Sequence, residues 1–494
     1  MINHLPLANL ILFMSMALAI PLFRKRSFSR TLVLGFIVLL LAIISSGVIL
    51  WHVNQQGPIH YFMGGHDARI GIEFVVDSFS AFFTLFIVLL ATIVYVYSSG
   101  DATEGIEEKE YGRYYILLFI LLMSMFGILY TNDLFNTYVF IEILSITTCS
   151  IISIKRKKDT YTSAFRYVML NEIGSLSYLF GVALIYMMTG YTNIALVGER
   201  LGHVWELYPA NTIIALGFMI IGIGIKAAIF PFHIWLPDAH SSAPSTSSAI
   251  LSAIVVKVYL LILIKIIYRV FGMDIILALN VNWVLLVMAA VGMIMGSVFA
   301  IAQKDVKRML GYSSVAQVGY IVLGIGLLSI EGLRAAFFHI LSHGIMKTAL
   351  FLSVGAIIFY KKTRKVNDFD GLGFAMPIAM GVFTIAALGM IGIPLTSGFI
   401  SKFKLGMAVL EGNQMILLII IMMSSLLNVI YYLPIIISAF LKNEKFQYRL
   451  QSVEKTPKLM MLPLVLLGLT ILFLGVFPNL MDGFLDQAIK SIIG

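Results

Sequence analysis

The chain has 494 residues, of which 60% are hydrophobic and only 12% are charged, and its mean hydropathy is +0.97. Average soluble domains carry roughly 25% charged residues, so this composition excludes an ordinary soluble domain. The net charge of +9 does not indicate nucleic-acid binding, because the basic residues sit in short loops between apolar stretches. The single cysteine, Cys149, excludes an internal disulfide, a four-cysteine zinc site and an iron–sulfur cluster held by this chain alone. We expect a multi-pass protein of the cell membrane, surrounded by lipid and without a cofactor of its own.

Repeated apolar runs of about 20 residues match the hydrocarbon thickness of a bilayer and predict an all-α fold of about fourteen membrane-spanning helices. The first run begins without a basic segment and has no small-residue cleavage site, so we interpret it as a retained helix and not as a signal peptide. The predicted spans are 5–23, 31–51, 75–98, 114–130, 133–154, 164–188, 211–235, 246–271, 281–302, 311–330, 334–360, 376–400, 413–441 and 459–478.

Lysines and arginines gather in alternate loops of this prediction. The basic clusters are Arg24–Arg30, Lys109–Arg113, Lys155–Lys158, Lys304–Arg308, Lys361–Lys365 and Lys442–Lys458. Basic loops mark the cytoplasmic side of a membrane protein. Both termini are therefore predicted on the outer side. The loop that follows the seventh span is the exception, because it carries no lysine or arginine.

Two predicted spans contain helix-breaking residues. Pro231 lies in the seventh span, and Gly389, Gly392, Pro394 and Gly398 lie within ten residues of one another in the twelfth. A proline removes a backbone donor and clashes with the carbonyl four residues back, and in lipid the freed polar groups need partners in protein or water. Broken helices at comparable places in two halves predict an internal repeat with a site at each break.

Five of the predicted spans place ionisable side chains near mid-membrane depth. They are Glu142 in the fifth span, Lys226 in the seventh, Lys257 in the eighth, His339, His343 and Lys347 in the eleventh, and Lys402 at the end of the twelfth. Each ionised group in hydrocarbon costs at least about 2.5–3.5 kcal/mol on insertion scales. A series of such residues therefore predicts a proton path rather than helices that only span the membrane.

The types of these residues suit proton transfer. A carboxylate about 4 Å from an ammonium gains about 4 kcal/mol at an effective dielectric constant near 20, so Glu142 and Lys226 are predicted to form a pair that acts as a switch. Burial disfavours the charged form of a lysine that has left its partner, and the proton would then pass to Lys257 and onward. Arginine would not serve, because it stays protonated.

These residues also have structural interpretations. Glu142 could be an ion-pair partner only, and Lys226 or Lys402 could extend the ammonium group to the membrane surface. His339 and His343 are spaced as in helical metal sites. No acidic or cysteine residue accompanies them, so we expect a proton path there and no metal, with His339 as an accessory residue.

Further accessory candidates follow the break in the seventh span. His233 could carry protons or could satisfy backbone groups at the break, and Asp238 and His240 border a predicted water-filled mouth. In the sixth span, Arg166 and Glu172 are expected to pair or to cap the start of the helix.

Five motifs resemble a known family in their residues and their order. They are NDLFNTYVFIE at 132–142, GIKAAIFPFHIWLPDAH at 224–240, KRMLGYSS at 307–314, HILSHGIMK at 339–347 and GIPLTSGFISK at 392–402. The chain is similar to the antiporter-like proton-pumping subunits of respiratory complex I and to the D-type component of Mrp-type Na⁺/H⁺ antiporters. Related chains occur in membrane-bound hydrogenases. The second motif is the most specific, and the resemblance covers nearly the whole chain.

The resemblance implies one membrane domain with two inverted five-helix repeats, at 114–271 and 281–441, and with broken seventh and twelfth helices. Residues 1–113 would hold three N-terminal helices, and 459–494 a last helix and its tail. Glu142 and Lys226 would form the modulating pair, and Lys257 would relay. His343 and Lys347 would join the halves, and Lys402 would be the exit.

The resemblance also implies a role within a larger complex of membrane subunits. We expect a proton-translocating subunit, with H⁺ and Na⁺ as candidate ions, of the Mrp D type; Lys402, which is glutamate in some members, favours that type or the N-like branch of complex I. The alternative is a pumping subunit of a complex I-like or hydrogenase complex, in which the redox chemistry would belong to other subunits. A non-pumping anchor of a redox enzyme and a stand-alone carrier of an organic solute remain as further alternatives.

Overall fold

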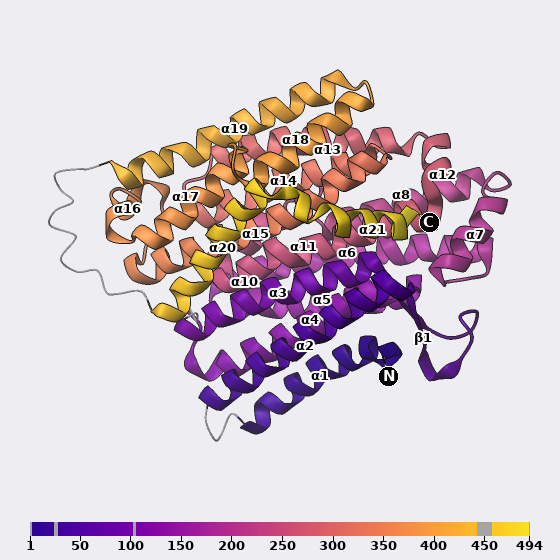
Figure 1. Cartoon of the computed structure of the whole chain (residues 1–494), viewed down its shortest axis with the longest axis horizontal. Coiled ribbons are helices and arrows are strands. Elements are labelled where there is room, and N and C mark those ends of the chain that lie inside the picture. Colours follow the sequence, from indigo (N-terminus) through magenta and orange to yellow (C-terminus); the bar gives the residue numbers. More distant parts are fainter. Residues whose placement is uncertain (1, 24–27, 102–104, 442–456, 494) are drawn as a thin grey trace.

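The apolar stretches of the sequence form one bundle of long helices (Figure 1). The computed structural model describes residues 2–23, 28–101, 105–441 and 457–493. Among these residues, 13 helices are long and apolar enough to cross a membrane. The chain is an all-α, multi-span membrane protein, as its composition predicted.

The helices follow the predicted order along the chain. The first six spans are α1 (Leu5–Phe23), α2 (Phe28–Gln56), α3 (Ser78–Asp101), α4 (Tyr111–Tyr130), α5 (Leu134–Ser153) and α6 (Lys158–Thr189). The seventh is α8 (Pro209–Lys226) with α9 (Trp235–Ser242), and the eighth is α10 (Ser245–Ile250) with α11 (Val256–Lys265) and two π-helical turns, Leu251–Val255 and Ile266–Phe271. The remaining spans are α13 (Val281–Ile301), α14 (Val306–Gly326), α15 (Ile330–Lys361), α17 (Pro377–Ile391) with α18 (Ser397–Glu411), α19 (Met415–Phe440) and α20 (Lys458–Val476).

The pair α17 and α18 accounts for the difference between 13 long helices and the predicted number. Each half has only 15 residues, which is too short for a hydrocarbon core about 30 Å thick. Gly392 ends α17 with a φ of +96°, a conformation that favours glycine. A Cβ atom on Gly398 would lie 1.9 Å from the Gly389 carbonyl oxygen, so only glycine allows the two halves to approach this closely. Both predicted breaks, in the seventh and twelfth spans, are therefore present.

Several short elements lie outside the predicted spans. They are β1 (Ile59–Phe62), β2 (Glu73–Val76), α7 (Ile194–Val204), α12 (Gly272–Ala278), α16 (Leu372–Ala375) and α21 (Asp482–Ile493). The 3-10 turns are Ile2–His4, Met63–Gly65, Glu108–Glu110, Val366–Asp368 and Pro478–Leu480. The two strands form an antiparallel hairpin in which Ile59 lies opposite Val76. The C-terminal helix α21 is amphipathic and buries Leu485, Ala488 and Ile492 on one face. A search for long apolar runs misses all of these elements because they are short.

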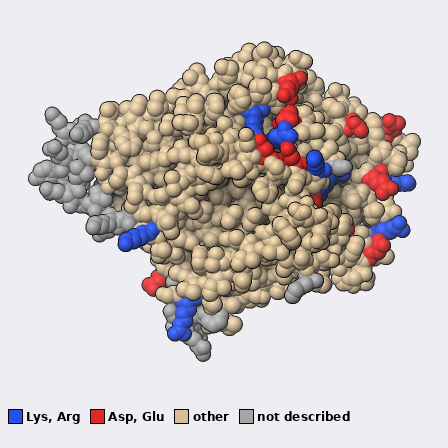
Figure 2. Space-filling view, viewed as in Figure 1, with Lys and Arg blue, Asp and Glu red and all other residues tan. Residues whose placement is uncertain are grey.

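Both ends of the described chain lie at the same end of the bundle, together with the hairpin, α7 and α12 (Figure 1). On the face in Figure 2, charged residues form two groups, the larger toward that end, with uncharged surface between them. Part of the basic-loop prediction, namely Arg24, Lys25, Arg26, Lys442, Lys445, Arg449 and Lys455, lies outside the described residues.

Candidate functional site

The first predicted pair lies where α5 meets the end of α8. Lys226 Nζ is 4.0 Å from Glu142 Oε1 and donates a hydrogen bond of 2.7 Å to Ser145 Oγ. The lysine side chain is completely buried, whereas that of Glu142 keeps 20% of its surface exposed. The Tyr259 ring lies 5.8 Å from the ammonium nitrogen. Glu172 of α6 also interacts electrostatically with both charged groups.

The break in the seventh span explains how a lysine is accommodated here. Lys226 is the last residue of α8, where the partial negative charge of the helix end favours a cation. The indole of Trp235, the first residue of α9, donates a hydrogen bond of 2.7 Å to the Ile225 carbonyl and so satisfies a backbone group freed by the break. A Cβ atom on Gly222 would lie 2.6 Å from the Gly174 carbonyl oxygen, so glycine is needed where α6 packs closely on α8.

Lys257 lies in the eighth span, just after the π-helical turn Leu251–Val255. Its buried ammonium group donates to the Ser252 carbonyl oxygen, an acceptor that a regular helix would use internally. π-Helical turns inside α-helices often occur at functional sites. The Ser252 hydroxyl lies 2.8 Å from the hydroxyl of Ser314 on α14, which links the eighth span to the second half of the chain.

The three predicted residues of α15 form one buried row. Lys347 donates to the Leu310 carbonyl at 2.7 Å and to the Ser313 hydroxyl. The rings of His343 and His339 are stacked with their centroids 5.8 Å apart. His339 Nδ1 lies 2.8 Å from Ser401 Oγ, next to Lys402 in α18. The row therefore leads from the start of α14 to the second broken helix.

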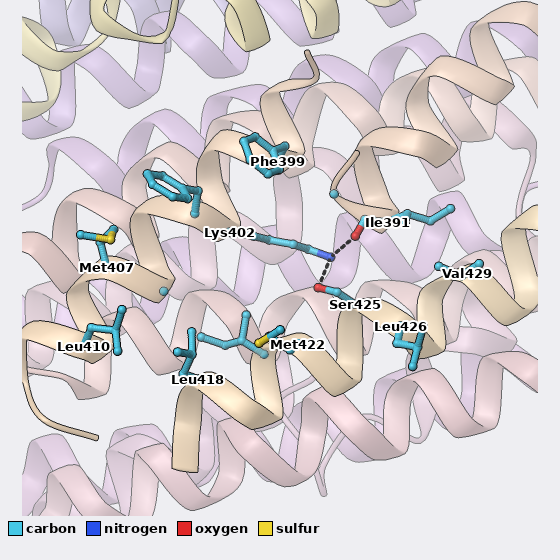
Figure 3. A pocket seen from close by; sticks show the side chains of 14 residues that line it. Ile391, Phe399, Lys402, Met407, Leu410, Leu418, Met422, Ser425, Leu426 and Val429 are labelled. Atoms are coloured by element: carbon cyan, nitrogen blue, oxygen red, sulfur yellow. Dashed lines mark hydrogen bonds between the residues drawn. The ribbon is translucent and has the colours of Figure 1, made fainter. Parts of the chain in front are cut away.

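Lys402 lies at the second break (Figure 3). Its ammonium group donates to the Met390 and Ile391 carbonyls at 2.8 and 3.1 Å, and to Ser425 Oγ at 3.1 Å. The Tyr320 ring lies 4.8 Å away. Within the described part of the chain, Lys402 has no ion-pair partner.

Lys402 also borders a cavity of about 510 Å³ between α18 and α19 (Figure 3). Apart from Lys402 and Ser425, its labelled lining is apolar: Ile391, Phe399, Met407, Leu410, Leu418, Met422, Leu426 and Val429. The second break is therefore open on one side to an apolar environment.

The accessory residues after Pro231 lie in different surroundings. The His233 ring stacks between Phe230 and Phe299, with centroids 5.1 and 5.9 Å away. His240 is completely buried, its two ring nitrogens have no hydrogen-bond partner among the described residues, and it interacts electrostatically with Lys347.

The carboxylate of Asp238 is held by two arginines. Arg166 Nη1 is 2.8 Å from Asp238 Oδ2, and Arg308 Nη2 is 3.1 Å from Oδ1. Arg166 thus pairs with Asp238 and not with Glu172, which corrects one structural expectation. The sequence favoured a partner in the same helix, whereas the fold brings α9 against α6.

Three further lysines are buried, although they were not predicted from the sequence as interior residues. Lys155 and Lys307, assigned to basic loops, are buried and both donate to the Ala243 carbonyl, at 3.4 and 2.5 Å. Lys265 donates to the carbonyls of Leu129 at 2.6 Å and of Ile128 and Thr131 at 3.4 and 3.3 Å. Its position eight residues after Lys257 in an apolar run was the available signal.

Residues 131–428 match the protein family described as "NADH:quinone oxidoreductase/Mrp antiporter, TM". This chain belongs to that family. The matched region contains every predicted site residue from Glu142 to Lys402 and both broken helices.

Relatives of the NADH:quinone oxidoreductase/Mrp antiporter family match along almost the whole chain. The N subunit of the NADH-quinone oxidoreductase of Desulforudis audaxviator is 35% identical and covers 100% of this chain and 98% of its own length. The D-type component of the Na(+)/H(+) antiporter of Alkalihalophilus pseudofirmus is 30% identical and covers 91% of this chain and 90% of its own length. The protein is thus an antiporter-like membrane subunit of the Mrp or complex I-like kind. The narrower prediction of the Mrp D type is not decided by these relatives.

Solved structures share the fold of this chain. A chain of the membrane-bound sulfane sulfur reductase, an archaeal respiratory membrane complex, has a TM-score of 0.90 at 28% identity, covering 99% of this chain and 97% of that one. A chain of the Mrp complex from Dietzia sp. DQ12-45-1b shows the same fold, with a TM-score of 0.89 at 23% identity and coverage of 100% and 97%.

Proposed function

We propose that this chain translocates protons through the buried Glu142, Lys226, Lys257, His343, Lys347 and Lys402, as a subunit of a larger membrane complex. The observation that carries the proposal is the Lys226 ammonium: it is completely buried, is 4.0 Å from Glu142 and donates a hydrogen bond to Ser145. A permanently charged lysine in such a place would be costly. Exchange of the lysine's proton as the carboxylate approaches and withdraws would explain why a lysine occupies this buried position.

The remaining polar groups support separate links of such a route. Ser145 Oγ lies 3.5 Å from the Tyr259 hydroxyl, two residues along the eighth span from Lys257. Ser252 and Ser314 then connect that span to α14, and Lys347 follows through Ser313. The row on α15 leads to Lys402 through the contact of His339 with Ser401.

Some buried polar atoms that lack a hydrogen-bond partner among the described residues, such as those of Thr31, Ser45, Ser46 and His52 in α2, lie away from this route, whereas several others lie near it. Those near the route include Glu142 Oε1, Tyr167 Oη, Ser397 Oγ and side-chain atoms of His240, Gln317 and His343. Buried polar groups in folded proteins are almost always bonded to protein or to ordered water. The atoms near the route support a path in which water molecules link the lysines and histidines.

In this mechanism the two halves act in turn. While Glu142 is close, Lys226 keeps its proton. When the pair opens, the proton moves toward Lys257, and from there along α15 to Lys402, which releases it on the far side. His233, His339, Asp238 and His240 are accessory groups. The inverted repeats at 114–271 and 281–441 are consistent with one break in each half, and the outward orientation of both termini remains part of the proposal.

The set of subunits that purify with the chain would decide the kind of complex. Small Mrp-like membrane subunits alone would assign an antiporter of H⁺ and Na⁺, and hydrogenase or iron–sulfur subunits would assign a redox pump. The printed names of the relatives include components of both NADH-quinone oxidoreductases and Na(+)/H(+) antiporters.

Proton movement by the Lys226→Ala variant tests the function itself. We expect the complex to assemble and proton transport in inverted membrane vesicles to fall to background. The control is Lys404→Ala, which removes a partly exposed lysine paired with Asp482 and should leave transport nearly unchanged. Normal transport by the assembled Lys226→Ala complex would favour a non-pumping membrane anchor.

A further inference from the structure

Gln317 of α14 is a buried amide near the proposed path that does not itself carry a proton in it. Its side chain is completely buried, and neither the amide oxygen nor the amide nitrogen has a hydrogen-bond partner among the described residues. Burying an amide without a hydrogen-bond partner is energetically unfavourable. Such a group calls for a bound polar molecule, and the surroundings of Gln317 indicate which one.

The register between α14 and α15 shows what Gln317 faces. Three contacts define the register: Ser313 with Lys347, Tyr320 with His339 at a ring distance of 5.5 Å, and Gly324 with Ala336, where an added Cβ would lie 3.0 Å from the alanine Cβ. Each step toward the end of α14 is matched by an equal step back along α15, as in any antiparallel pair. An added Cβ on Gly324 would also lie 2.6 Å from the Gly332 carbonyl oxygen, so the register places Gln317 opposite the turn of α15 that runs from His339 to His343.

The pair in the middle of this row differs from its two neighbours. Lys347 is bonded to Ser313, and His339 is bonded through Nδ1 to Ser401. Both ring nitrogens of His343 lack a hydrogen-bond partner among the described residues, as do both amide atoms of Gln317. Two completely buried side chains with four unsatisfied polar atoms thus lie on facing turns of α14 and α15.

We propose that Gln317 is a positioning residue that holds a water molecule against the imidazole of His343. This inference rests on the proposed proton path and assigns one further residue to it. An amide donates and accepts hydrogen bonds at once, so it can fix a water molecule without taking up a proton. In the proton step, the Lys347 ammonium gives a proton through water to one ring nitrogen of His343. The other ring nitrogen releases its proton toward His339, so the imidazole ends neutral, in its other tautomer.

Three substitutions of Gln317 separate this role from a purely structural one. Gln317→Leu fills the space and excludes water, and we expect proton transport per assembled complex to fall about tenfold or more, because misplaced transfer groups lose large factors in rate. Gln317→Ala leaves room for water and should transport faster than Gln317→Leu. Gln317→His restores a donor and an acceptor and should stay within about threefold of the wild type.

A structural role predicts the opposite order. Because cavities in a packed interior are destabilising, Gln317→Ala would then be the worse variant and Gln317→Leu nearly normal. Gln317→Met supplies a second apolar variant where Gln317→Leu lowers the amount of complex. The matched control is Asn9→Leu, which removes a buried amide of α1 that contacts Tyr130 at 3.4 Å, away from the row; its transport per complex should equal that of the wild type.

Parallel measurements keep this inference distinct from the function. If Lys226→Ala and Lys347→Ala lose transport while Gln317→Leu and Gln317→Met transport normally, the inference is overturned and the proposed path stands. If both lysine variants transport normally, the path itself fails. Loss in the two apolar variants with recovery in Gln317→His supports the inference.

Discussion

The two broken helices hold a lysine in different ways. Lys226 has a carboxylate 4.0 Å away and one hydroxyl acceptor, whereas Lys402 has two backbone carbonyls and one hydroxyl and no ion-pair partner in the described structure. The carbonyls of Met390 and Ile391 come from the C-terminal end of α17, whose partial negative charge stabilises a cation.

We propose that this difference gives the two lysines different tasks. A carboxylate on a separate helix can approach and withdraw, so the charge of Lys226 can be switched by a movement of α5 or α8. Backbone carbonyls at the end of a helix are fixed, so Lys402 keeps a constant environment. We therefore place the switch in the first half and a fixed release site in the second.

Among the variants that test this difference, Glu142→Gln is expected to change the rate of proton transport most. The variant removes the charge that distinguishes the first lysine, and the lost attraction is about 4 kcal/mol at an effective dielectric constant near 20. Because Glu142 is partly exposed, the attraction that is lost should be smaller than this. We therefore expect the rate of proton transport measured in vesicles to fall about a hundredfold. Glu172→Gln, which removes a second carboxylate that interacts with Lys226, should cost less. Equal losses in the two variants would show that no specific switch pair exists.

An intermediate effect is expected from Ser425→Ala. It removes one of the three acceptors of Lys402 and leaves both carbonyls in place. A hydrogen bond to a charged group contributes about 1.5–3 kcal/mol, and with two acceptors remaining we expect transport to fall about fivefold. Ser424→Ala is the control, since that hydroxyl donates instead to the Met293 carbonyl. A complete loss of proton transport in Ser425→Ala would show that transport depends on the surroundings of Lys402 as strongly as on those of Lys226.

The smallest effect is expected at Glu73, on the hairpin outside the membrane. Burial raises the pKa of this carboxyl, but hydrogen bonds from His60, Asn132 and Asn193 outweigh burial and hold the pKa below its ordinary value. Asn132 lies just before α5, which carries Glu142, so Glu73 supports the scaffold of the first half. Its stabilising contribution is complete above the ordinary pKa of about 4.5 and is lost as the pH falls through the lower folded value.

Thermal unfolding of the purified protein at several pH values measures this contribution. Glu73→Gln should be less stable than the wild type at pH 7 by about 1 kcal/mol, and the difference should shrink below about pH 4. Transport at pH 7 should change less than twofold. A difference that persists unchanged in acid would show that the carboxylate charge contributes nothing.

Much of the fold could be predicted from the sequence, because hydrophobic runs, Pro231 and Gly392 act locally. The buried lysines of single spans could be found in the same way, since each interrupts an apolar run. Pairing between distant helices could not be predicted locally. Arg166 meets Asp238 because α9 packs against α6, and Lys307 is buried where it donates to the Ala243 carbonyl.

The role of a buried, uncharged residue could not be predicted from the sequence either. Gln317 does not stand out in an apolar run that contains serines and a tyrosine, and only the register of α14 on α15 brings it opposite the turn of α15 that runs from His339 to His343. Charge is conspicuous in a membrane span, whereas a neutral amide becomes informative only when its partners are known.

Proton transport by the Lys226→Arg variant tests the central claim most directly. Arginine keeps the positive charge and the hydrogen bonds but does not release its proton. We expect the assembled complex with this variant to move no protons in vesicles. Transport at the wild-type rate would contradict the account, because the charge and not the proton of Lys226 would then be what the protein needs.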